Sequence, residues 1–226
     1  MRVVAISVLL ALSAIPAHAG SCVDPQTLLP SVVQLTSRIG EGAQGTAWFF
    51  GTADQLVTVE HVVERGKLDG SWRHIELRQT GYFGVQRVDV MARVSRMVDT
   101  GLAERLAILQ LDREIPNARI ATVRETPLSP NELAVGIAYP SGEMHIGTGW
   151  FRRFSVLTDW IDWRAGYGLF DIAEQFDPFA LRRGGASGGP IFDCQGKVGS
   201  VFKGISLQKE FTHVAIPTHA LAKLRR

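Results

Sequence analysis

The chain has 226 residues, 46% of them hydrophobic, and its 24 basic and 22 acidic residues leave a formal net charge of +2. This near-neutral balance argues against a nucleic-acid or anionic-membrane partner, since both need a strongly basic surface. The length suits one sizeable all-β domain or two small, closely joined barrels.

The first residues resemble a secretory signal peptide. Arg2 precedes an apolar run from Val3 to Ile15, and Ala17-His18-Ala19 has the small-residue pattern of a cleavage site. The apolar run is too short to span a bilayer, which disfavours a membrane anchor. We therefore expect cleavage after Ala19 and a secreted or periplasmic domain, residues 20–226, without a stable membrane anchor.

Two cysteines, Cys22 and Cys194, follow this leader. In an oxidising compartment we expect them to form a disulfide that ties the N-terminal arm to a strand near the end of the chain. Two buried thiols are the alternative, because sequence does not show whether the side chains are close.

The first half of the chain predicts short strands separated by turns. Residues 45–50 and 55–59 are rich in β-branched and aromatic side chains and flank the turn 51–54, a pattern that predicts a hairpin. One helical turn is expected at residues 60–65. The other strands expected in this half cover residues 31–36, 75–77, 86–90 and 106–111. Such segments, without long stretches of helical period, indicate an all-β barrel or sandwich.

The second half follows a segment rich in Pro, Asn, Arg and Thr, residues 112–130, which we interpret as the joint between two halves. Strands are expected at residues 133–138, 145–154, 191–193, around 198, and at 212–217. Residues 170–183 look less regular. Thr218 is expected to cap a short helix, residues 219–224.

A serine stands among four glycines in the segment Gly184 to Pro190. Such a segment favours a tight turn that exposes the Ser187 hydroxyl beside unencumbered N–H groups, as acyl transfer requires. The same residues fit the G-x-S-x-G elbow of α/β-hydrolases. That reading fails, because a strand, a turn and a strand are expected after Pro190 instead of a helix and the rest of a doubly wound domain. The partner we expect for the serine is His61, at the end of the strand 55–59.

In this order, the motifs resemble the chymotrypsin-fold serine peptidases, and among them the bacterial HtrA-type (Deg-like) branch. Residues 57–63 are similar to the branch's L-T-N-A-H-V-V, residues 106–109 to the end of D-L-A-V-L, residues 136–142 to G-N-P-F-G, residues 185–190 to G-N-S-G-G-P, and residues 214–217 to F-A-I-P. The similarity covers about residue 30 to the end.

The resemblance implies a fold of two six-stranded antiparallel β-barrels, at about 30–115 and 131–217, with a C-terminal helix at about 218–226. It also implies a serine endopeptidase acting on polypeptide substrates, with Ser187 as nucleophile and His61 as general base. The oxyanion hole would be formed by the N–H groups of Gly185 and Ser187. We expect no cofactor and no metal, since the six histidines show no ligand spacing. The oligomeric state stays open.

The acid of the triad is where the sequence departs from the family. The family's aspartate stands directly before Leu106, and this chain has Arg105 there. Glu104 is adjacent, but strand alternation points neighbouring side chains to opposite faces, so it could serve only if a bulge or its longer side chain re-aimed it. Asp99 could reach in from the preceding loop. Without either acid, the chain would be a non-catalytic relative that binds peptides.

The resemblance also suggests a specificity pocket. Leu181 aligns with the base of the pocket, which makes cleavage after Lys or Arg unexpected and favours small or medium apolar residues. Arg182 and His213 flank the pocket in the family, which leaves an acidic preference as the alternative. Ala186 precedes the serine and has no carboxylate, so the activation switch of animal zymogens is not available. Esterase activity on small acyl esters would use the same machinery.

Overall fold

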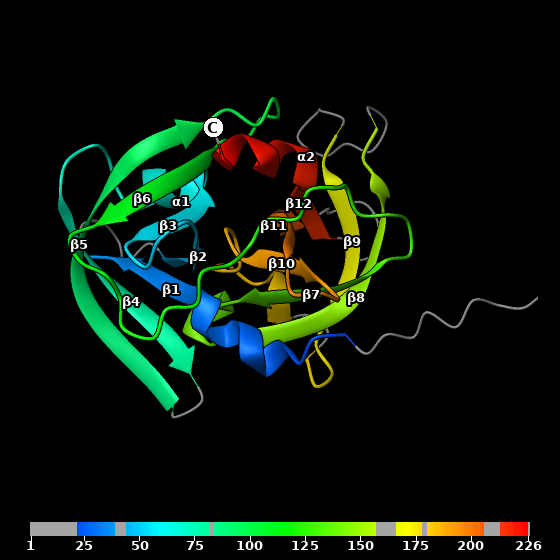
Figure 1. Cartoon of the computed structure of the whole chain (residues 1–226), viewed down its shortest axis with the longest axis horizontal. Coiled ribbons are helices and arrows are strands. Elements are labelled where there is room, and N and C mark those ends of the chain that lie inside the picture. The colour runs from blue at the N-terminus through cyan, green and yellow to red at the C-terminus, as the bar shows by residue number, and fades with distance from the viewer. Residues whose placement is uncertain are drawn as a thin grey trace, which may run out of the picture.

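Two closed antiparallel β-barrels make up the protein. The computed structural model describes residues 22–38, 44–81, 84–156, 166–177, 180–205 and 213–225, so the expected signal peptide lies outside the described residues. Figure 1 shows the barrels side by side, with the helix α2 (Thr218–Leu221) lying above the region between them. The expected fold class, all-β with two six-stranded barrels and a short C-terminal helix, is confirmed.

The first barrel closes in the order β1-β2-β3-β6-β5-β4. Its strands are β1 (Val32–Ser37), β2 (Gln44–Phe49), β3 (Gln55–Val59), β4 (Arg73–Gly81), β5 (Gly84–Val98) and β6 (Leu106–Leu111). The expected hairpin is the β2–β3 pair, and the expected helical turn is α1 (Glu60–Arg65), directly after β3. The fourth and fifth strands are longer than the sequence pattern indicated, because they pair along nine positions as one long ribbon.

The second barrel closes in the order β10-β11-β12-β9-β8-β7. Its strands are β7 (Leu133–Ala138), β8 (His145–Phe154), β9 (Gly168–Ala173), β10 (Pro190–Asp193), β11 (Val198–Ile205) and β12 (His213–Pro217). The segment expected to be irregular, residues 170–183, begins inside β9 and ends in the short 3₁₀ helix η4 (Ala180–Arg182). Pairing of β9 with both β8 and β12 overrides its weak local pattern.

The C-terminal helix differs from expectation at its first turn. Thr218 is the first residue of α2 and does not cap it, because its hydroxyl donates to the carbonyl of Gly199 at 2.5 Å. The 3₁₀ helix η5 (Ala222–Arg225) directly follows α2. Thr218 therefore fastens the helix to β11 instead of satisfying an N–H group at the helix start.

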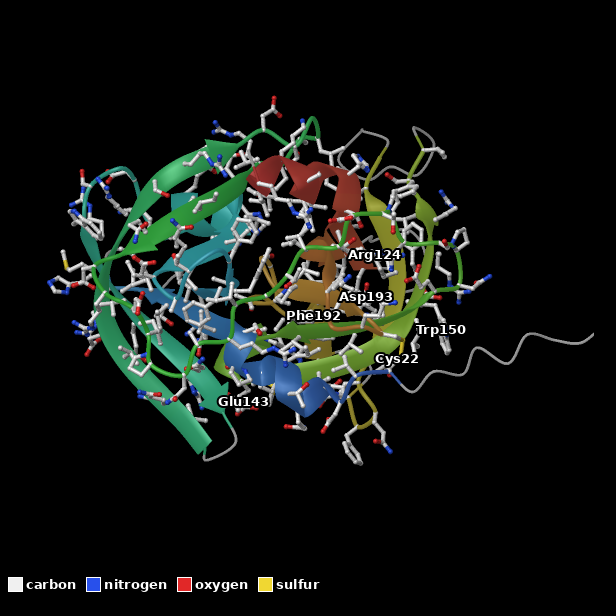
Figure 2. The ribbon with its side chains drawn as sticks, viewed as in Figure 1. Cys22, Arg124, Glu143, Trp150, Phe192 and Asp193 are labelled. Atoms are coloured by element: carbon white, nitrogen blue, oxygen red, sulfur yellow. A yellow bond between two sulfur atoms is a disulfide. The ribbon has the colours of Figure 1, made fainter. Side chains whose placement is uncertain are left out.

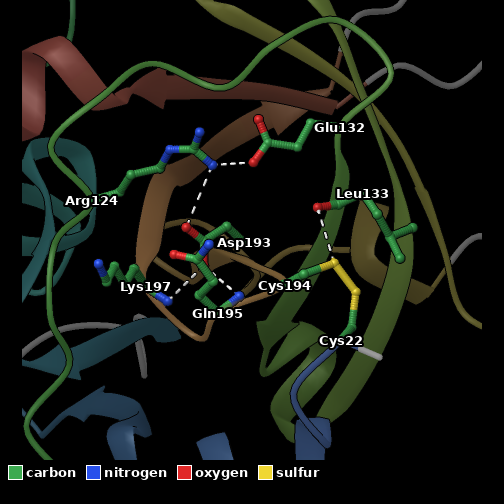
Figure 3. The surroundings of a disulfide bond; sticks show 8 residues. All are labelled: Cys22, Arg124, Glu132, Leu133, Asp193, Cys194, Gln195 and Lys197. Atoms are coloured by element: carbon green, nitrogen blue, oxygen red, sulfur yellow. Dashed lines mark hydrogen bonds and ion pairs between the residues drawn. A yellow bond between two sulfur atoms is a disulfide. The ribbon is translucent and has the colours of Figure 1, made fainter. Parts of the chain in front are cut away.

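The N-terminal arm is fixed to the second barrel by the disulfide between Cys22 and Cys194 (Figure 3). The N–H of Val23 donates to the Cys194 carbonyl at 2.9 Å, and the 3₁₀ helix η1 (Pro25–Ser31) then leads into β1. The expected disulfide is thus present. No helix in the described part of the chain is long and apolar enough to cross a membrane.

The segment between the barrels, residues 112–132, runs past β10 without forming a strand of its own among the described residues. Arg124 on this segment pairs with Glu132 and with Asp193, the latter at 3.4 Å. Figure 2 shows Arg124 beside Asp193, above the Cys22 end of the N-terminal arm. Because Asp193 is 3% exposed and Arg124 largely buried, this ion pair ties the joint to the strand that follows the serine turn.

Polar contacts join the barrels where they face each other. The Thr46 hydroxyl on β2 accepts the N–H of Tyr139 at 2.9 Å and donates to the Gly185 carbonyl at 2.8 Å. The Tyr139 hydroxyl accepts the N–H of Thr80 on β4 at 2.9 Å. These hydrogen bonds hold the serine turn of the second barrel against the strands of the first.

Candidate active site

His61 and Glu104 meet in the first barrel. His61 lies in the first turn of α1, and Glu104 lies two residues before β6, which pairs with β3. The Glu104 Oε1 atom lies 3.0 Å from His61 Nδ1 and also accepts the His61 backbone N–H at 2.9 Å. The Glu104 side chain is 10% exposed and the His61 side chain 24% exposed. A carboxylate at Nδ1 requires the proton on that nitrogen and leaves Nε2 with its lone pair facing outward.

The charge state of Glu104 is set by its neighbours. Burial alone would raise the pKa of Glu104, but the hydrogen bonds and charge of His61, together with the charge of Lys203, hold that pKa below its usual value. Glu104 is therefore a carboxylate at neutral pH, as a partner for an imidazolium must be.

Arg105 does not face the imidazole. Its guanidinium and its backbone N–H both bind Glu60, with an Nε to Oε1 distance of 2.7 Å. The Arg105 side chain is 49% exposed, so the cation points to solvent. Alternation does separate the two neighbours, as expected, but it is Glu104 that points inward. Arg105 takes the place of the family's aspartate in the sequence, but the side chain that meets the imidazole is that of Glu104, one position earlier.

The other candidate acid, Asp99, lies away from the imidazole. Asp99 is exposed, and its Oδ1 accepts the N–H of Gly101 at 2.8 Å in the loop before Glu104. Glu60 is also not simply solvated, because the hydrogen bond from the Arg105 side chain is the largest of the effects that lower its pKa. Of the acids considered, the structure brings only Glu104 to His61.

The serine turn depends on glycines with left-handed backbone. Gly185 has φ of +102° and Gly188 has φ of +88°. A Cβ at Gly185 would lie 2.6 Å from the Tyr139 carbonyl oxygen, and one at Gly188 would lie 2.3 Å from the Thr58 hydroxyl. The backbone on both sides of Ser187 therefore approaches its neighbours more closely than any side chain allows. Thr58 stands three residues before His61, so the turn packs on the strand that delivers the imidazole.

Two backbone N–H groups and one hydroxyl lie together at the serine turn. The Gly184 carbonyl accepts the N–H of Ser141 at 2.7 Å, and peptide planarity then points the Gly185 N–H the opposite way. Among the described residues, neither the Gly185 nor the Ser187 N–H has an acceptor. The Ser187 hydroxyl donates to the Lys203 carbonyl at 3.0 Å. Among the described residues it makes no hydrogen bond to the His61 ring.

A cavity of about 110 Å³ opens beside Ser187. Its walls include Leu181, Arg182, Ala186 and Phe202, which places two of the three expected pocket residues on it. The third, His213, is fully buried and does not line the cavity. Its ring lies behind the pocket wall, 5.3 Å from the Phe202 ring.

One residue of this site was not among the sequence candidates. Lys203 is half-buried on β11, its carbonyl holds the Ser187 hydroxyl, and its charge acts on Glu104. A lysine directly after the segment Val198–Phe202 was the available signal, because that segment contains two valines and a phenylalanine and predicts a strand.

Two six-stranded antiparallel barrels, joined side by side with a histidine from the first and a serine turn from the second, define the chymotrypsin-type fold. Sequence comparison finds no matching family model and no matching curated protein. Comparison of structures does find this fold in proteases, among them a serine endoprotease and an HtrA-type protease.

An inactive form of Rv3671c from M. tuberculosis H37Rv is 21% identical, with a TM-score of 0.63, over 88% of this chain and 87% of that one. Deg5 is 19% identical, with a TM-score of 0.59, over 88% of each chain. The serine endoprotease from Yersinia pestis is 15% identical, with a TM-score of 0.62, over 87% of this chain and 62% of that one. At these identities the likeness establishes the shared fold.

Proposed function

We propose that the protein is a serine endopeptidase, with Ser187 as nucleophile, His61 as general base and Glu104 as the acid that orients it. The observation that carries the proposal is the 3.0 Å contact between Glu104 Oε1 and His61 Nδ1. The His61 imidazole belongs to the first barrel, and the serine turn of the second barrel packs against that barrel. A carboxylate in that position fixes the tautomer that accepts a proton and stabilises the imidazolium.

The reaction would proceed through an acyl-enzyme. The Ser187 oxygen attacks the carbonyl carbon of the substrate while its proton passes to His61 Nε2. The negative charge on the former carbonyl oxygen is received by the N–H groups of Gly185 and Ser187, which have no acceptor among the described residues. The imidazolium then protonates the leaving amine, and a water molecule, deprotonated by His61, releases the acyl group.

The resting hydroxyl of Ser187 has to change its partner before attack. It donates to the Lys203 carbonyl, and rotation about one side-chain torsion between staggered positions would redirect it. Catalytic hydrogen bonds are commonly formed only when substrate is bound. We propose that an extended substrate backbone displaces the hydroxyl from this carbonyl.

A fluorophosphonate probe tests the proposal directly. We expect wild-type protein to be labelled, and labelling to be lost in Ser187→Ala and His61→Ala. The matched controls, exposed Ser129→Ala and exposed His74→Ala, should be labelled like the wild type. Glu104→Gln should reduce the labelling rate by about 10³ to 10⁴, because an amide cannot hold the correct tautomer, whereas Asp99→Asn should have little effect.

An unlabelled but folded wild type would instead support the second candidate, a peptide-binding relative without catalysis. The observation that favours this candidate is the Ser187 hydroxyl bound to Lys203 in place of His61. The replacement of the family's aspartate by Arg105 is a weaker argument for a peptide-binding relative, because the Arg105 side chain binds Glu60 and faces solvent. Labelling together with hydrolysis of small acyl esters, but not of peptides, would support an esterase.

We propose small or medium apolar side chains as the residues before the cleaved bond. The cavity beside Ser187 holds about 110 Å³, and Leu181, Ala186 and Phe202 give it apolar walls. The alternative, acidic residues, is favoured by the positive charge of Arg182 on the same wall. A peptide-library cleavage profile separates the two, and a preference for Lys or Arg would contradict the position assigned to Leu181.

We infer that the protein acts outside the cytoplasm, secreted or periplasmic, on unfolded or extended polypeptide. The Cys22–Cys194 disulfide supports this inference, since such bonds persist in oxidising compartments. Mass spectrometry of the exported protein should give a chain that begins at Gly20. A protein that keeps its leader and reduced cysteines would contradict the inference.

A further inference from the structure

Two pairs of sequence neighbours face each other where α1 meets the start of β6. Glu60 and His61 open α1, and Glu104 and Arg105 directly precede β6. The Glu60 N–H donates to the Arg105 carbonyl at 3.0 Å, and the His61 N–H donates to Glu104 Oε1 at 2.9 Å. Each residue of one pair is therefore bound to one residue of the other.

The Glu60 carboxylate binds both the side chain and the backbone of Arg105. Its Oε1 accepts the guanidinium, with Nε at 2.7 Å, and its Oε2 accepts the Arg105 backbone N–H at 3.2 Å. With the bond from the Glu60 N–H to the Arg105 carbonyl, these contacts close a ring between the two residues. Only 16% of the Glu60 side chain is exposed, so the ring is better protected from water than an ordinary surface ion pair.

The peptide unit between Glu104 and Arg105 is held at both of its polar ends. Its carbonyl, that of Glu104, accepts the buried Thr100 hydroxyl at 2.5 Å, and its N–H, that of Arg105, donates to Glu60. Because a peptide unit is planar, fixing both ends sets the backbone torsion at Glu104 and with it the direction of the side chain. The preceding N–H, that of Glu104, donates to the Tyr167 hydroxyl at 3.1 Å.

We propose that Glu60 and Arg105 form a positioning pair, which fixes the peptide unit after Glu104 and so keeps the Glu104 carboxylate on His61. The inference rests on the proposed function, because the alignment of that carboxylate matters for turnover only if the protein is a hydrolase. The pair also gives a role to an arginine that stands in the place of the family's aspartate, since its cation binds the residue before the histidine.

Loss of this support should slow the chemical step more than it weakens substrate binding. Neither Glu60 nor Arg105 lines the cavity beside Ser187. A displacement of about 1 Å can cost a catalytic group about 10²-fold in rate, whereas removal of the acid itself costs about 10³- to 10⁴-fold. We therefore expect Glu60→Ala to lower kcat by about 10- to 100-fold and to leave KM nearly unchanged.

The first test measures kcat and KM on a peptide substrate at one pH. Glu60→Ala removes the whole pair, and Glu60→Gln, which keeps an acceptor for the Arg105 N–H but loses the charge, should fall between Glu60→Ala and the wild type. Asp89→Ala is the matched control, because it removes an exposed carboxylate that binds Arg38 at 2.5 Å on the same barrel. An unchanged kcat in Glu60→Ala, or a loss confined to KM, would overturn the inference. If Glu60→Ala does not fold, Glu60→Gln and Arg105→Met supply the same comparison.

A double-mutant cycle shows whether the pair acts through Glu104. In a Glu104→Gln background, Glu60→Ala should lower kcat little further, because the group that it positions is no longer a carboxylate. The full decrease in that background would mean that Glu60 acts on the reaction by another route, and would overturn the inference.

A third measurement needs no turnover. In a Ser187→Ala background, the NMR resonance of the His61 Nδ1 proton reports its hydrogen bond to Glu104. We expect a low-field resonance that persists in Asp89→Ala and moves upfield or is lost in Glu60→Ala. A wild type that resists fluorophosphonate labelling but shows this change would refute the proposed peptidase and retain the positioning role. Labelling of the wild type, with neither kcat nor the resonance altered by Glu60→Ala, would refute only the positioning role.

Discussion

His213 should make the protein lose stability as the pH falls. It is the first residue of β12, is 0% exposed, and neither of its ring nitrogens makes a hydrogen bond in the described structure. Burial first, and the charge of Arg182 second, lower its pKa from 6.5 to about 4, against smaller opposing effects of nearby backbone groups and a carboxylate. The folded protein thus holds this side chain neutral at a pH where the unfolded chain protonates it.

The magnitude follows from the difference between the two states. Because the pKa is lower in the folded state, the unfolded state gains its proton first, and stability falls from pH 6.5 down to about 4. At 1.36 kcal/mol per pKa unit, the full loss is about 3 kcal/mol, of which about 2 kcal/mol falls between pH 7 and pH 5. Carboxylates with lowered pKa, such as Glu104 and Glu60, lose their stabilising effect only as the pH falls toward and below the unfolded value of 4.5, so they contribute little between pH 7 and pH 5.

Urea unfolding at pH 7 and pH 5 measures this loss, in a Ser187→Ala background that prevents self-digestion. We expect the parent to lose about 2 kcal/mol more than the same protein with His213→Phe, whose ring cannot take up a proton. His74→Phe, at an exposed histidine, should behave like the parent. Equal losses in the parent and the His213→Phe variant would refute the reasoning that a buried neutral histidine opposes acid stability.

Three further outcomes are expected from the structure. Gly185→Ala should lower kcat on a peptide by about 10² to 10³, because the new Cβ would meet the Tyr139 carbonyl at 2.6 Å and displace an oxyanion donor; Gly70→Ala, where a Cβ meets nothing within 4 Å, is the control. Replacing both Cys22 and Cys194 by Ala should lower the free energy of unfolding by about 2–4 kcal/mol, because the bond joins residues 172 positions apart and restricts the unfolded chain. Unfolding of this variant in urea should then be insensitive to reductant. Incubation of the mature protein with trypsin should leave its hydrolysis rate unchanged, because Ala186 has no carboxylate to pair with a new N-terminus; a large rise would contradict that reading.

The sequence was sufficient for the features that depend on local patterns. The β2–β3 hairpin has two strand-forming segments around a turn that contains Gly and Asp, and this pattern is a strong short-range signal for a hairpin. The serine turn was recognised because four glycines cannot form the interior of a helix, and two of them do adopt a left-handed backbone. Strand β9 was missed, because its register is set by the strands on both sides and not by its own residues.

Tertiary structure alone decided which side chains of the site face each other. Glu104 and Arg105 are neighbours in sequence, and the choice between them depends on where β6 begins and on which face of the chain meets α1. Lys203, whose charge acts on the same carboxylate, lies where the register of β11 and β12 shifts. A sequence fixes the order of charges along a chain, but a one-residue change in register reverses which of them is buried, and that register is set by contacts between distant strands.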